Sequence, residues 1–547
     1  MEVGDRPRQA SPARALMLAS APMPIRKVLI ANRGEIAIRV ARTCREMGLA
    51  TVAIYSDADR AALHVRTCDE ALRIGPPASR ESYLLIDAVR GAAQQSGADA
   101  IPPGYGFLSE NAAFARACRD KNITFIGPPP EAMDEMGEKT RARRKAEGAG
   151  VPIVPGLKEP LADTPDGVAF GRRYAGEIGY PIMLKAAAGG GGKGMRLVTE
   201  AKEFDNALAT AQREAISAFG DGRVYIEKAI SRPRHVEIQI FADQHGRCIY
   251  LGERECSVQR RHQKVIEETP SPIVDEELRR RMGEVAVKAA LAVGYVGAGT
   301  VEFLVDGNTR HFYFLEMNTR LQVEHPVTEL CTGTDLVRWQ IDVASGKPLP
   351  WTQDEVARNL RGHAIEARLY AEDPAKNFMP SPGRILELKL ASGPGVRNDC
   401  GVESGSEVPR FYDPMVGKVV VWAPTRLEAI DRLHRALGET VVKGIKTNTH
   451  YLKRVLELEE FRRGDYDTGL LSRAADRLIP PKPGPDEPLT ESEVVALAAA
   501  AIWQLEQDER AALGGAQRGP GGAGPDRLAA QSDWARAGRL SSLRRQP

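Results

Sequence analysis

The sequence predicts an α/β protein that begins with a doubly wound, Rossmann-like domain. Three observations predict this class. Strand and helix signals alternate through residues 26–55, a run of glycines lies between two apolar strands in residues 180–198, and polar residues alternate with apolar ones in residues 311–326. The length of 547 residues is enough for three or four domains of ordinary size.

The composition excludes several classes of protein. Lys and Arg total 75 and Asp and Glu total 73, a net charge of +2, whereas a dedicated nucleic-acid binder usually carries a basic excess. No apolar run is long enough to predict a membrane-spanning helix. The 7 cysteines are scattered without a CxxC pair, which argues against a disulfide framework or a structural zinc site and favours a cytoplasmic location.

The two ends of the chain lack the patterns of a folded domain. Residues 1–24 are rich in small residues, Pro and Arg, and they predict a disordered extension or an upstream translation start before Met23. Residues 476–547 contain a Pro-rich linker at 480–488, an Ala- and Leu-rich helix at 490–513 and a Gly-, Ala- and Arg-rich stretch that is expected to be disordered.

The first domain opens with a strand–helix–strand pattern. Residues 26–31 form a short apolar run typical of a buried strand, residues 36–47 predict a helix that Gly48 ends, and residues 51–55 predict the next strand. Alternation of this kind favours a parallel sheet. Gly34 is the only glycine in the first turn, so the GxGxxG pattern of dinucleotide-binding proteins is missing. We therefore expect this region to act mainly as a scaffold.

The glycine run predicts a hairpin with a mobile tip. An apolar strand ending near Lys185, five glycines within residues 189–194, and a second apolar strand follow one another. The P-loop pattern is not met, because no Ser or Thr follows Lys193. Glycine lets backbone N–H groups approach phosphate oxygens closely, and Lys185 is placed to meet a phosphate charge. A phosphate-binding loop is therefore favoured over a hairpin tip without a ligand.

Residues 224–230 predict a strand that leaves this hairpin, with Glu227 in it. The backbone of such a strand can read an adenine, but an ordinary edge strand has the same pattern. The segment alone does not separate the two interpretations.

Residues 311–326 carry an unusual polar face. Where this segment is extended, a period of two places these polar side chains on one face: Glu316, Asn318, Arg320, Gln322 and Glu324. A solvated face usually contains Lys, Ser and Thr rather than this mixture of acids, amides and a guanidinium. A binding role is therefore favoured over simple exposure to solvent.

A second apolar strand, at residues 299–305, contains a lone acid, Glu302. If this strand pairs with the one that carries Glu316, two carboxylates and the Asn318 carbonyl come together. Two like charges on buried strands are costly unless a cation lies between them, and hard oxygen ligands suit Mg²⁺. The sequence therefore predicts a magnesium site at this position.

Residues 254–264 form a dense basic cluster. Cys256, Gln259 and His262 are interleaved with its Arg and Lys residues, and acids follow at positions 267 and 268. A surface charge run is the ordinary explanation for such a segment. The interleaved residues favour an anion site, for a phosphate or a small oxyanion.

Eight segments carry a resemblance to a known family: KVLIANRGEIAIRVAR (27–42), GYGFLSEN (104–111), AAAGGGGKGM (186–195), RHVEIQIFAD (234–243), RECSVQRRHQK (254–264), EMNTRLQVEHPVTE (316–329), RGHAIEARLYAEDP (361–374) and KGIKTNTHYL (443–452). Over about residues 25–475 the chain closely resembles biotin carboxylase, the ATP-grasp component of biotin-dependent carboxylases. The segments 254–264 and 316–329 are highly specific motifs of this family.

The resemblance implies three folded domains. They are an N-terminal Rossmann-like domain at 25–138, an ATP-grasp domain at 139–356 with a mobile lid at 157–229, and an α+β biotin carboxylase C-terminal domain at 357–475.

The resemblance also implies site residues, position by position. Nucleotide contacts fall on Lys139, Lys185, Gly191, Gly192, Glu227, Lys228, Ile230, His235 and Gln259. Glu302, Glu316 and Asn318 match the ligands of the metal, Mg²⁺ or Mn²⁺. Lys264, Arg320 and Val323 match the residues that bind bicarbonate. Glu324 matches the general base, Arg320 the catalytic arginine, and Arg368 the residue that stabilises the biotin enolate. Two departures from the family pattern, Pro102 for His and Glu138 for Asp, affect no catalytic position.

The activity implied by the resemblance is the ATP- and bicarbonate-dependent carboxylation of biotin through carboxyphosphate. Biotin carriers hold their target lysine in a Met-Lys-Met context, whereas the last methionine here is Met415. Biotin is therefore expected as a substrate bound to a separate biotin carboxyl carrier protein, with carboxyltransferase subunits as further partners and a homodimer of this chain. The alternatives are another ATP-grasp ligase and a catalytically silent scaffold subunit. The sequence does not specify which acyl-CoA or keto acid is finally carboxylated.

Overall fold

The computed structural model describes residues 25–162, 164–187, 195–479, 494–495, 498–506 and 508. The chain divides into two units, Met1–Pro480 and Pro481–Pro547. The described residues of the second unit are helical, and they lie within the stretch expected to form a helix. The expected extension at 1–24, the Pro-rich stretch at 480–488 and the tail beyond 508 lie outside the described residues. Within the described part of the chain, no helix is long and apolar enough to cross a membrane.

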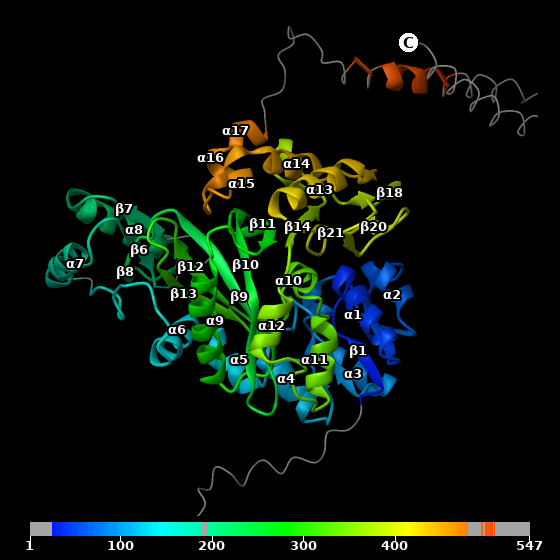
Figure 1. Ribbon diagram of the computed structural model, residues 1–547, viewed down its shortest axis with the longest axis horizontal. Helices are drawn as coiled ribbons and strands as arrows, with labels where there is room; N and C mark the ends of the chain where they lie inside the picture. Colours follow the sequence, from blue (N-terminus) through cyan, green and yellow to red (C-terminus); the bar gives the residue numbers. More distant parts are fainter. Residues whose placement is uncertain are drawn as a thin grey trace, which may run out of the picture. The chain divides into compact units, whose positions relative to one another are not determined.

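A five-stranded sheet of order β3-β2-β1-β4-β5 forms the start of the fold (Figure 1). Its strands are β1 (Lys27–Ile30), β2 (Ala50–Ser56), β3 (Glu70–Gly75), β4 (Ala100–Ile101) and β5 (Thr124–Phe125). All of their pairings are parallel, which confirms the parallel sheet predicted from the alternation.

Helices cover both faces of this parallel sheet. Val28 and Ile30 pack in one buried cluster with residues of α1 (Gly34–Glu46), whereas Leu29 packs in another with residues of α3 (Ile86–Ser96) and α4 (Ala112–Arg119). Burial on both faces explains why the first strand is a continuous apolar run rather than an alternating one. Helix α1 begins at Gly34, slightly before the start expected from the sequence.

A larger sheet of eight antiparallel strands has the order β13-β12-β9-β10-β11-β14-β21-β19. Its strands are β9 (Pro233–Ala242), β10 (Cys248–Arg260), β11 (Gln263–Thr269), β12 (Gly297–Asp306), β13 (Phe312–Asn318), β14 (His363–Tyr370), β19 (Val396–Cys400) and β21 (Met415–Ala423). The β11–β14 pairing makes this one sheet continuous from the middle of the chain into its last third.

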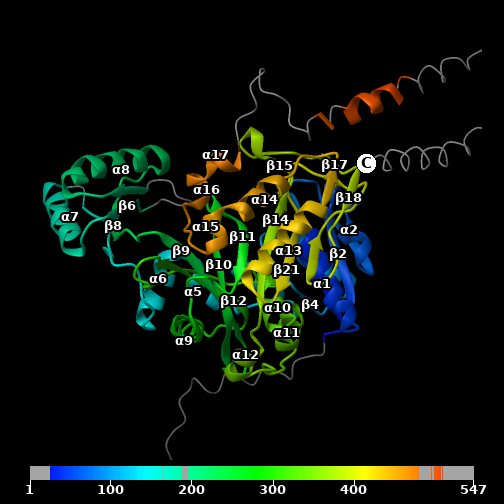
Figure 2. The same cartoon turned by 45° about the horizontal axis from the view of Figure 1, so that its top comes forward.

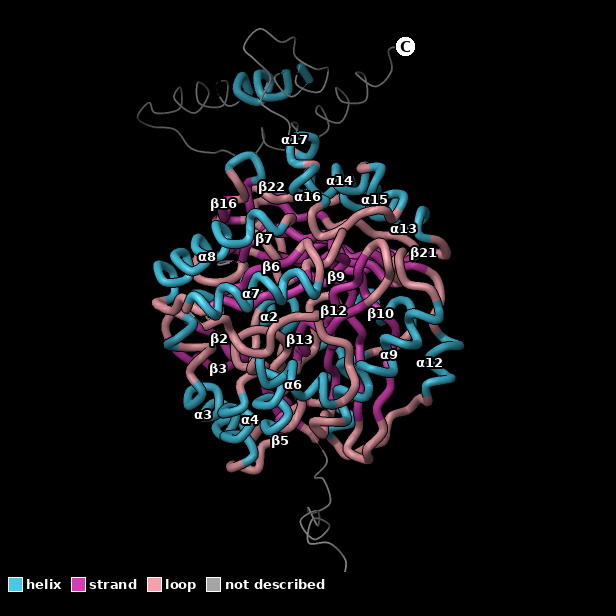
Figure 3. The backbone as a smooth tube through the Cα atoms, turned by 90° about the vertical axis from the view of Figure 1, so that its left-hand side faces the viewer, coloured by secondary structure: helices cyan, strands magenta, loops and turns pink. Residues whose placement is uncertain are grey.

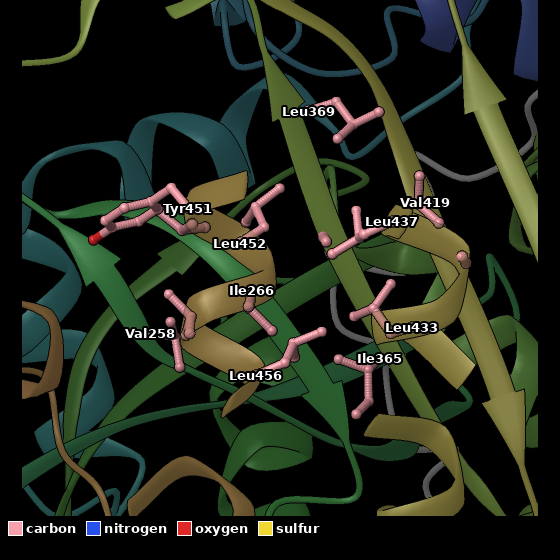
Figure 4. Packing of buried hydrophobic residues seen from close by; sticks show 14 of the residues in the cluster. Val258, Ile266, Ile365, Leu369, Val419, Leu433, Leu437, Tyr451, Leu452 and Leu456 are labelled. Carbon is pink, nitrogen blue, oxygen red and sulfur yellow. The ribbon is translucent and has the colours of Figure 1, made fainter. Parts of the chain in front are cut away.

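Different helices cover different parts of this sheet (Figures 1 and 2). Helix α9 (Glu276–Leu291) packs against β9 and β10. Helix α13 (Arg426–Glu439) packs against β14 and β21, and α14 (Thr449–Glu457) packs against β14 and α13. Figure 4 shows the second contact, in which Leu433 and Leu437 lie among Ile365, Leu369 and Val419 of the strands. Helix α10 (His325–Thr332) also packs against β14 and contributes to a separate buried cluster.

The glycine-containing hairpin belongs to a small sheet of order β7-β6-β8 (Figure 1). Its elements are β6 (Ile182–Ala186), β7 (Met195–Val198) and β8 (Val224–Lys228), with α7 (Pro165–Ile178) and α8 (Phe204–Phe219) packed on it. Figure 3 shows the strands β6 and β7 beside α7 and α8. Strands β6 and β7 pair antiparallel, which confirms the predicted hairpin. This small sheet has a core of its own, which includes Leu161, Leu184, Phe204 and Ile226.

The other elements are shorter or peripheral. The helices are α2 (Leu63–Thr67), α5 (Pro130–Gly137), α6 (Lys139–Gly148), α11 (Leu336–Ala344), α12 (Gln353–Asn359), α15 (Glu459–Arg463), α16 (Leu470–Arg473) and α17 (Ala475–Leu478). Three two-stranded sheets pair β15 (Glu372–Asp373) with β16 (Met379–Pro380), β17 (Gly383–Arg384) with β20 (Glu407–Val408), and β18 (Glu387–Lys389) with β22 (Val441–Lys443).

Candidate active site

A row of charged side chains crosses four neighbouring strands of the large sheet. Glu302 on β12 pairs in register with Glu316 on β13 and with Glu237 on β9, and Glu237 pairs with Arg254 on β10. Three carboxylates side by side repel one another unless cations lie among them. Arg254 supplies one such cation, because its Nε donates to Glu237 Oε1 at 2.5 Å.

Lys264, on β11, is the cation that joins the carboxylates. Its Nζ donates to Glu237 Oε2 at 2.7 Å, to Glu302 Oε1 at 3.0 Å and to Glu324 Oε1 at 2.6 Å. Burial disfavours the charged ammonium, but the anionic groups around it outweigh that cost and raise the pKa of Lys264 well above its ordinary value. Lys264 therefore stays charged and links three carboxylates from three separate elements.

Glu302 is the most heavily bonded of these acids. In addition to Lys264, it accepts hydrogen bonds from Asn318 Nδ2 at 2.9 Å and lies 2.9 Å from His235 Nε2. Burial favours the neutral acid, yet Lys264 and His235 hold the pKa of Glu302 well below its ordinary value. Glu302 is therefore held as a charged carboxylate, which can attract a further cation.

The donor set around Glu302 suits a divalent metal ion. Glu302 and Glu316 lie opposite each other on adjacent strands, and Asn318 follows on the same strand as Glu316. Carboxylate and amide oxygens are hard ligands that Mg²⁺ and Mn²⁺ prefer. His235, Glu237 and Glu302 also bring ligand atoms within 4.8 Å of one another. The residues expected to bind the metal therefore suit such an ion in their chemistry, and the strand register puts them on neighbouring positions.

Glu324 connects this cluster to the last third of the chain. It is fully buried at the start of α10, and its Oε2 accepts a hydrogen bond from Arg368 Nη2 on β14 at 2.9 Å. The Nε of Arg368 also donates to Glu267 Oε1 at 2.6 Å. Burial favours the neutral acid, but Lys264 and Arg368 hold the pKa of Glu324 well below its ordinary value. A chain of ion pairs therefore runs from Glu302 through Glu324 to Arg368.

The alternation predicted for residues 311–326 ends with the strand. β13 stops at Asn318, and the residues from Thr319 to Glu324 form a turn rather than an extended segment. In this turn Arg320 Nη2 donates to Asn318 Oδ1 at 3.0 Å, and its Nε donates to Glu110 Oε2 at 2.8 Å. The turn brings Glu324 back toward Lys264, so these polar residues gather by folding over rather than by sharing one strand face.

The residues expected to contact the nucleotide lie on the small sheet and beside the large one. Lys185 on β6 is half-buried, and its Nζ donates to Glu227 Oε2 on β8 at 2.5 Å. Arg143 on α6 donates to the other oxygen of Glu227. Lys228 instead donates to the carbonyl of Gly179 at 2.8 Å. The two cations at Glu227 outweigh its burial and hold its pKa below the ordinary value.

The remaining expected residues are placed less fully. Ile230 and Gln259 are half-buried, the latter near the end of β10 opposite Lys264. Gly191 and Gly192 lie outside the described residues, as does the side chain of Lys139 at the start of α6.

The sequence assigned no role to three members of this network, Glu110, Arg143 and Glu237. Arg254 and Glu267 belong to the segment expected to bind an anion, but here they pair with Glu237 and Arg368. One signal for Glu237 was present. It alternates with apolar residues in 235–241 and lies on the same strand face as His235. The sequence pattern does not show that Glu237 belongs to the site. That follows only from the strand register, which places Glu237 directly beside Glu302.

Family models match most of the chain. The biotin carboxylase N-terminal domain matches residues 24–133, the ATP-binding domain of the carbamoyl-phosphate synthase L chain matches residues 138–352, and the biotin carboxylase C-terminal domain matches residues 366–473.

Individual proteins are similar over much of their length. A biotin carboxylase of Halalkalibacterium halodurans is 54% identical over 447 residues, which cover 82% of this chain and 97% of the relative. The propionyl-CoA carboxylase alpha chain of Ruegeria pomeroyi is 49% identical over 509 residues, which cover 89% and 73%. A solved dimer of the biotin carboxylase domain of Hydrogenobacter thermophilus 2-oxoglutarate carboxylase, in complex with MgADP, ADP and bicarbonate, is 44% identical with a TM-score of 0.75, covering 83% of this chain and 99% of that one. The fold, the network and these similarities agree, and the chain belongs to the biotin carboxylase family.

Proposed function

We propose that this chain carboxylates biotin with ATP and bicarbonate, the first half-reaction of a biotin-dependent carboxylase. One observation carries the proposal. Lys264 bonds both Glu302 and Glu324, and Glu324 bonds Arg368. One continuous network of charges therefore joins Glu302, proposed to act at the nucleotide, Glu324, proposed as the base for bicarbonate, and Arg368, proposed to act on biotin.

The nucleotide is proposed to bind between the small sheet and Glu302. Lys185 can leave its ion pair with Glu227 and bind the phosphates. The Glu227 carboxylate would still be paired, because Arg143 also donates to it. Lys139, Gly191, Gly192, Lys228, Ile230, His235 and Gln259 complete the proposed contacts. Mg²⁺ or Mn²⁺, held by Glu302, Glu316 and Asn318, supplies neutralisation of the charge on the phosphates.

Bicarbonate is proposed to bind at the turn that precedes α10. Lys264, Arg320 and the backbone N–H of Val323 hold the anion, and Glu324 accepts its proton. Lys264 and Arg368 keep Glu324 ionised and so able to act as a base. When bicarbonate takes a hydrogen bond from Lys264, Glu324 loses part of that stabilisation, and its pKa moves upward. Substrate binding thus increases the basicity of Glu324 at the moment when it is needed.

Carboxylation then follows in the closed site. The bicarbonate oxygen attacks the γ-phosphoryl group of ATP and releases ADP and carboxyphosphate, which breaks down to CO₂ and phosphate. The phosphate removes the proton of the ureido nitrogen of biotin, and that nitrogen attacks CO₂. The guanidinium of Arg368 stabilises the negative charge on the ureido oxygen of the biotin enolate. Its bonds to Glu267 and Glu324 fix the plane of that guanidinium before biotin arrives.

The proposal includes partners and a location. The biotin is presented by a separate biotin carboxyl carrier protein, carboxyltransferase subunits use the product, and this chain forms a homodimer. The similarity to a solved dimer of the same domain, and the near-complete coverage of a relative named simply biotin carboxylase, support this arrangement. The cysteines are all free thiols, in keeping with a cytoplasmic protein.

The test is an assay of ADP release with and without bicarbonate and free biotin. ATP cleavage is expected to require bicarbonate and to accelerate when biotin is added. Glu324→Gln should abolish the response, because a neutral amide cannot take the bicarbonate proton. Lys443→Met, at an exposed residue whose side chain pairs with Glu387, serves as the control that should behave like the unmodified chain. ATP turnover that ignores both ligands would refute the proposal.

A further inference from the structure

Lys418 is a buried cation for which neither the family motifs nor the proposed mechanism provides a role. It lies on β21 in a strand of apolar residues, and its side chain is inaccessible to solvent. Its Nζ donates to the carbonyl oxygen of Val323 at 2.6 Å. Val323 immediately precedes Glu324, and its backbone N–H is the group proposed to bind bicarbonate. A lysine from the last third of the chain therefore holds the backbone of the proposed bicarbonate site.

The surroundings of Lys418 keep it charged. Glu35 Oε1 of α1 lies 3.2 Å from its Nζ, and Asp399 Oδ2 of β19 lies 3.9 Å away. Burial disfavours the ammonium, but Glu35, Glu366 and Asp399 outweigh that cost and raise the pKa of Lys418 above its ordinary value. A charged donor forms a stronger hydrogen bond to a carbonyl than a neutral one does.

The two peptide groups on either side of Val323 are both fixed. The carbonyl of Val323 is held by Lys418, and the carbonyl of Gln322 lies 2.8 Å from His325 Nδ1. Because each peptide group is planar, holding the Gln322 carbonyl also fixes the direction of the Val323 N–H. Holding the Val323 carbonyl fixes the peptide that leads into Glu324. Together these two contacts determine where the N–H and the carboxylate point.

Lys418 also couples this turn to the arginine for biotin. β14 and β21 pair antiparallel, and Lys418 lies directly opposite Arg368 in their register. Arg368 reaches Glu324 from β14, while Lys418 reaches Val323 from β21. Two consecutive residues of the turn, Val323 and Glu324, are thus held by two residues that lie opposite each other on neighbouring strands.

We propose that Lys418 is a positioning residue for bicarbonate: its ammonium orients the Val323 backbone and the Glu324 carboxylate from beneath the site. The inference rests on the proposed function, since it assigns Lys418 to the bicarbonate step of that reaction. Lys418 acts through the Val323 peptide group and not through contact with a substrate. Its loss should therefore raise KM for bicarbonate while KM for ATP changes little.

The test must separate positioning from fold stability, because Lys418→Met leaves the buried Glu35 without the cation that pairs with it, whereas Asp399 keeps its pair with Arg397. The decisive variant is Lys418→Met/Glu35→Gln, which removes the cation together with the charge of Glu35, the carboxylate 3.2 Å from it. Glu35→Gln alone keeps the bond from Lys418 to Val323 and serves as the matched control. KM for bicarbonate, KM for ATP and the midpoint of thermal unfolding are measured for each variant.

Lys418→Met is expected to lower the unfolding midpoint and to raise KM for bicarbonate by roughly tenfold or more, the effect of losing one charged hydrogen bond. The double variant should regain much of the lost midpoint but keep the raised KM for bicarbonate. KM for ATP should stay within about twofold in both, since the loss is confined to one peptide. A folded double variant with an unchanged KM for bicarbonate, or with both KM values raised equally, would overturn the assignment.

Lys418→Arg decides the question if the methionine variants do not fold. It keeps a cation beside Glu35, but its longer, planar head cannot reproduce the 2.6 Å contact with Val323. A raised KM for bicarbonate with an unchanged KM for ATP supports positioning, and unchanged values of both overturn it. The unmodified chain is assayed in parallel. If it lacks bicarbonate-dependent ATP cleavage, the proposed function fails; if it has that activity, a negative result removes only the role of Lys418.

Discussion

Glu302 of β12 and Glu316 of β13 lie directly opposite each other in the register of the large sheet. This placement puts two acidic residues opposite each other on neighbouring strands, where a divalent cation would relieve their repulsion and hold the nucleotide. Glu302→Gln and Glu316→Gln should each lower ATP turnover by roughly 100-fold or more, because the lost charge leaves the phosphates misplaced. The measurement is ADP release over a range of Mg²⁺ concentrations, in which each variant should require more metal than the unmodified chain.

Glu284→Gln is the matched control for this pair. Glu284 is an exposed residue of α9 that pairs with Arg280, so its loss should leave both turnover and the metal requirement unchanged. Near-normal turnover in either Glu302→Gln or Glu316→Gln would remove that residue from the metal site.

Much of the fold could be predicted because its signals are local. The run 26–31 and the helix that follows it specify β1 and α1 through apolar periodicity, and the glycines at 189–194 mark the β6–β7 hairpin. The β11–β14 pairing could not be predicted in this way. It joins segments about 100 residues apart in sequence, and period-2 patterns show which face of a strand is buried but not which strand lies beside it.

The small sheet should respond to nucleotide binding. It has a core separate from that of the large sheet, and β6 and β7 are joined by the glycine-containing loop. A non-hydrolysable ATP analogue should therefore slow hydrogen exchange at the amides of β6 and β7, because phosphate contacts hold the hairpin closed. Exchange in β1, in the five-stranded parallel sheet, provides the internal reference and should not change. Equal protection of β6 and β7 with and without the analogue would disprove the lid assignment.

His64 should make the stability of the chain depend on pH. Its side chain is fully buried, its Nε2 lies 3.2 Å from the carbonyl of Ile54, and burial lowers its pKa to about 4. In the unfolded chain the pKa is about 6.5, so between these two values the unfolded chain binds a proton that the folded chain does not. The free energy of unfolding therefore falls as pH falls through this window, by about 2 kcal/mol between pH 7 and pH 5.

The measurement compares the unmodified chain with His64→Asn by chemical denaturation at both pH values. The stability advantage of the unmodified chain over the variant should shrink by about that amount at pH 5, since asparagine does not titrate. An advantage that is equal at pH 7 and pH 5 would mean that His64 does not cause the acid sensitivity.

The candidate site was predictable to different degrees. The pairing of Glu302 with Glu316 followed from two acids in apolar strands, and the structure confirms that register. The roles expected for Lys264, Glu324 and Arg368 came from the family resemblance, because the three residues lie on separate elements that no local pattern connects. Lys418 gave no signal at all. A single lysine in the strand Met415–Ala423 resembles a solvent-facing residue until its partners, which are distant in sequence, are known.

Arg368 and Glu324 should affect different chemical steps although they are bonded to each other. The guanidinium of Arg368 stabilises charge that appears only after biotin is deprotonated, whereas Glu324 acts on bicarbonate before carboxyphosphate exists. Arg368→Ala leaves Glu324 paired with Lys264 at 2.6 Å, so appreciable bicarbonate-dependent ATP cleavage should persist. Biotin carboxylation should fall by about 10²–10³-fold, the usual effect of removing one positioned donor. Glu324→Ala should lose both activities together.

The two activities are measured on the same protein preparations, as ADP release and as fixation of labelled bicarbonate into biotin. Lys264 provides the physical reason to expect a separation, since it supplies the second cation that keeps Glu324 ionised when Arg368 is absent. Arg368→Lys tests the geometry, because an ammonium keeps the charge but cannot bond Glu267 and Glu324 with a planar fork. It should retain ATP cleavage and regain only part of the carboxylation. If Arg368→Ala lowers ADP release and carboxylation by the same factor, Arg368 also acts before biotin is deprotonated, and its confinement to the biotin step is wrong.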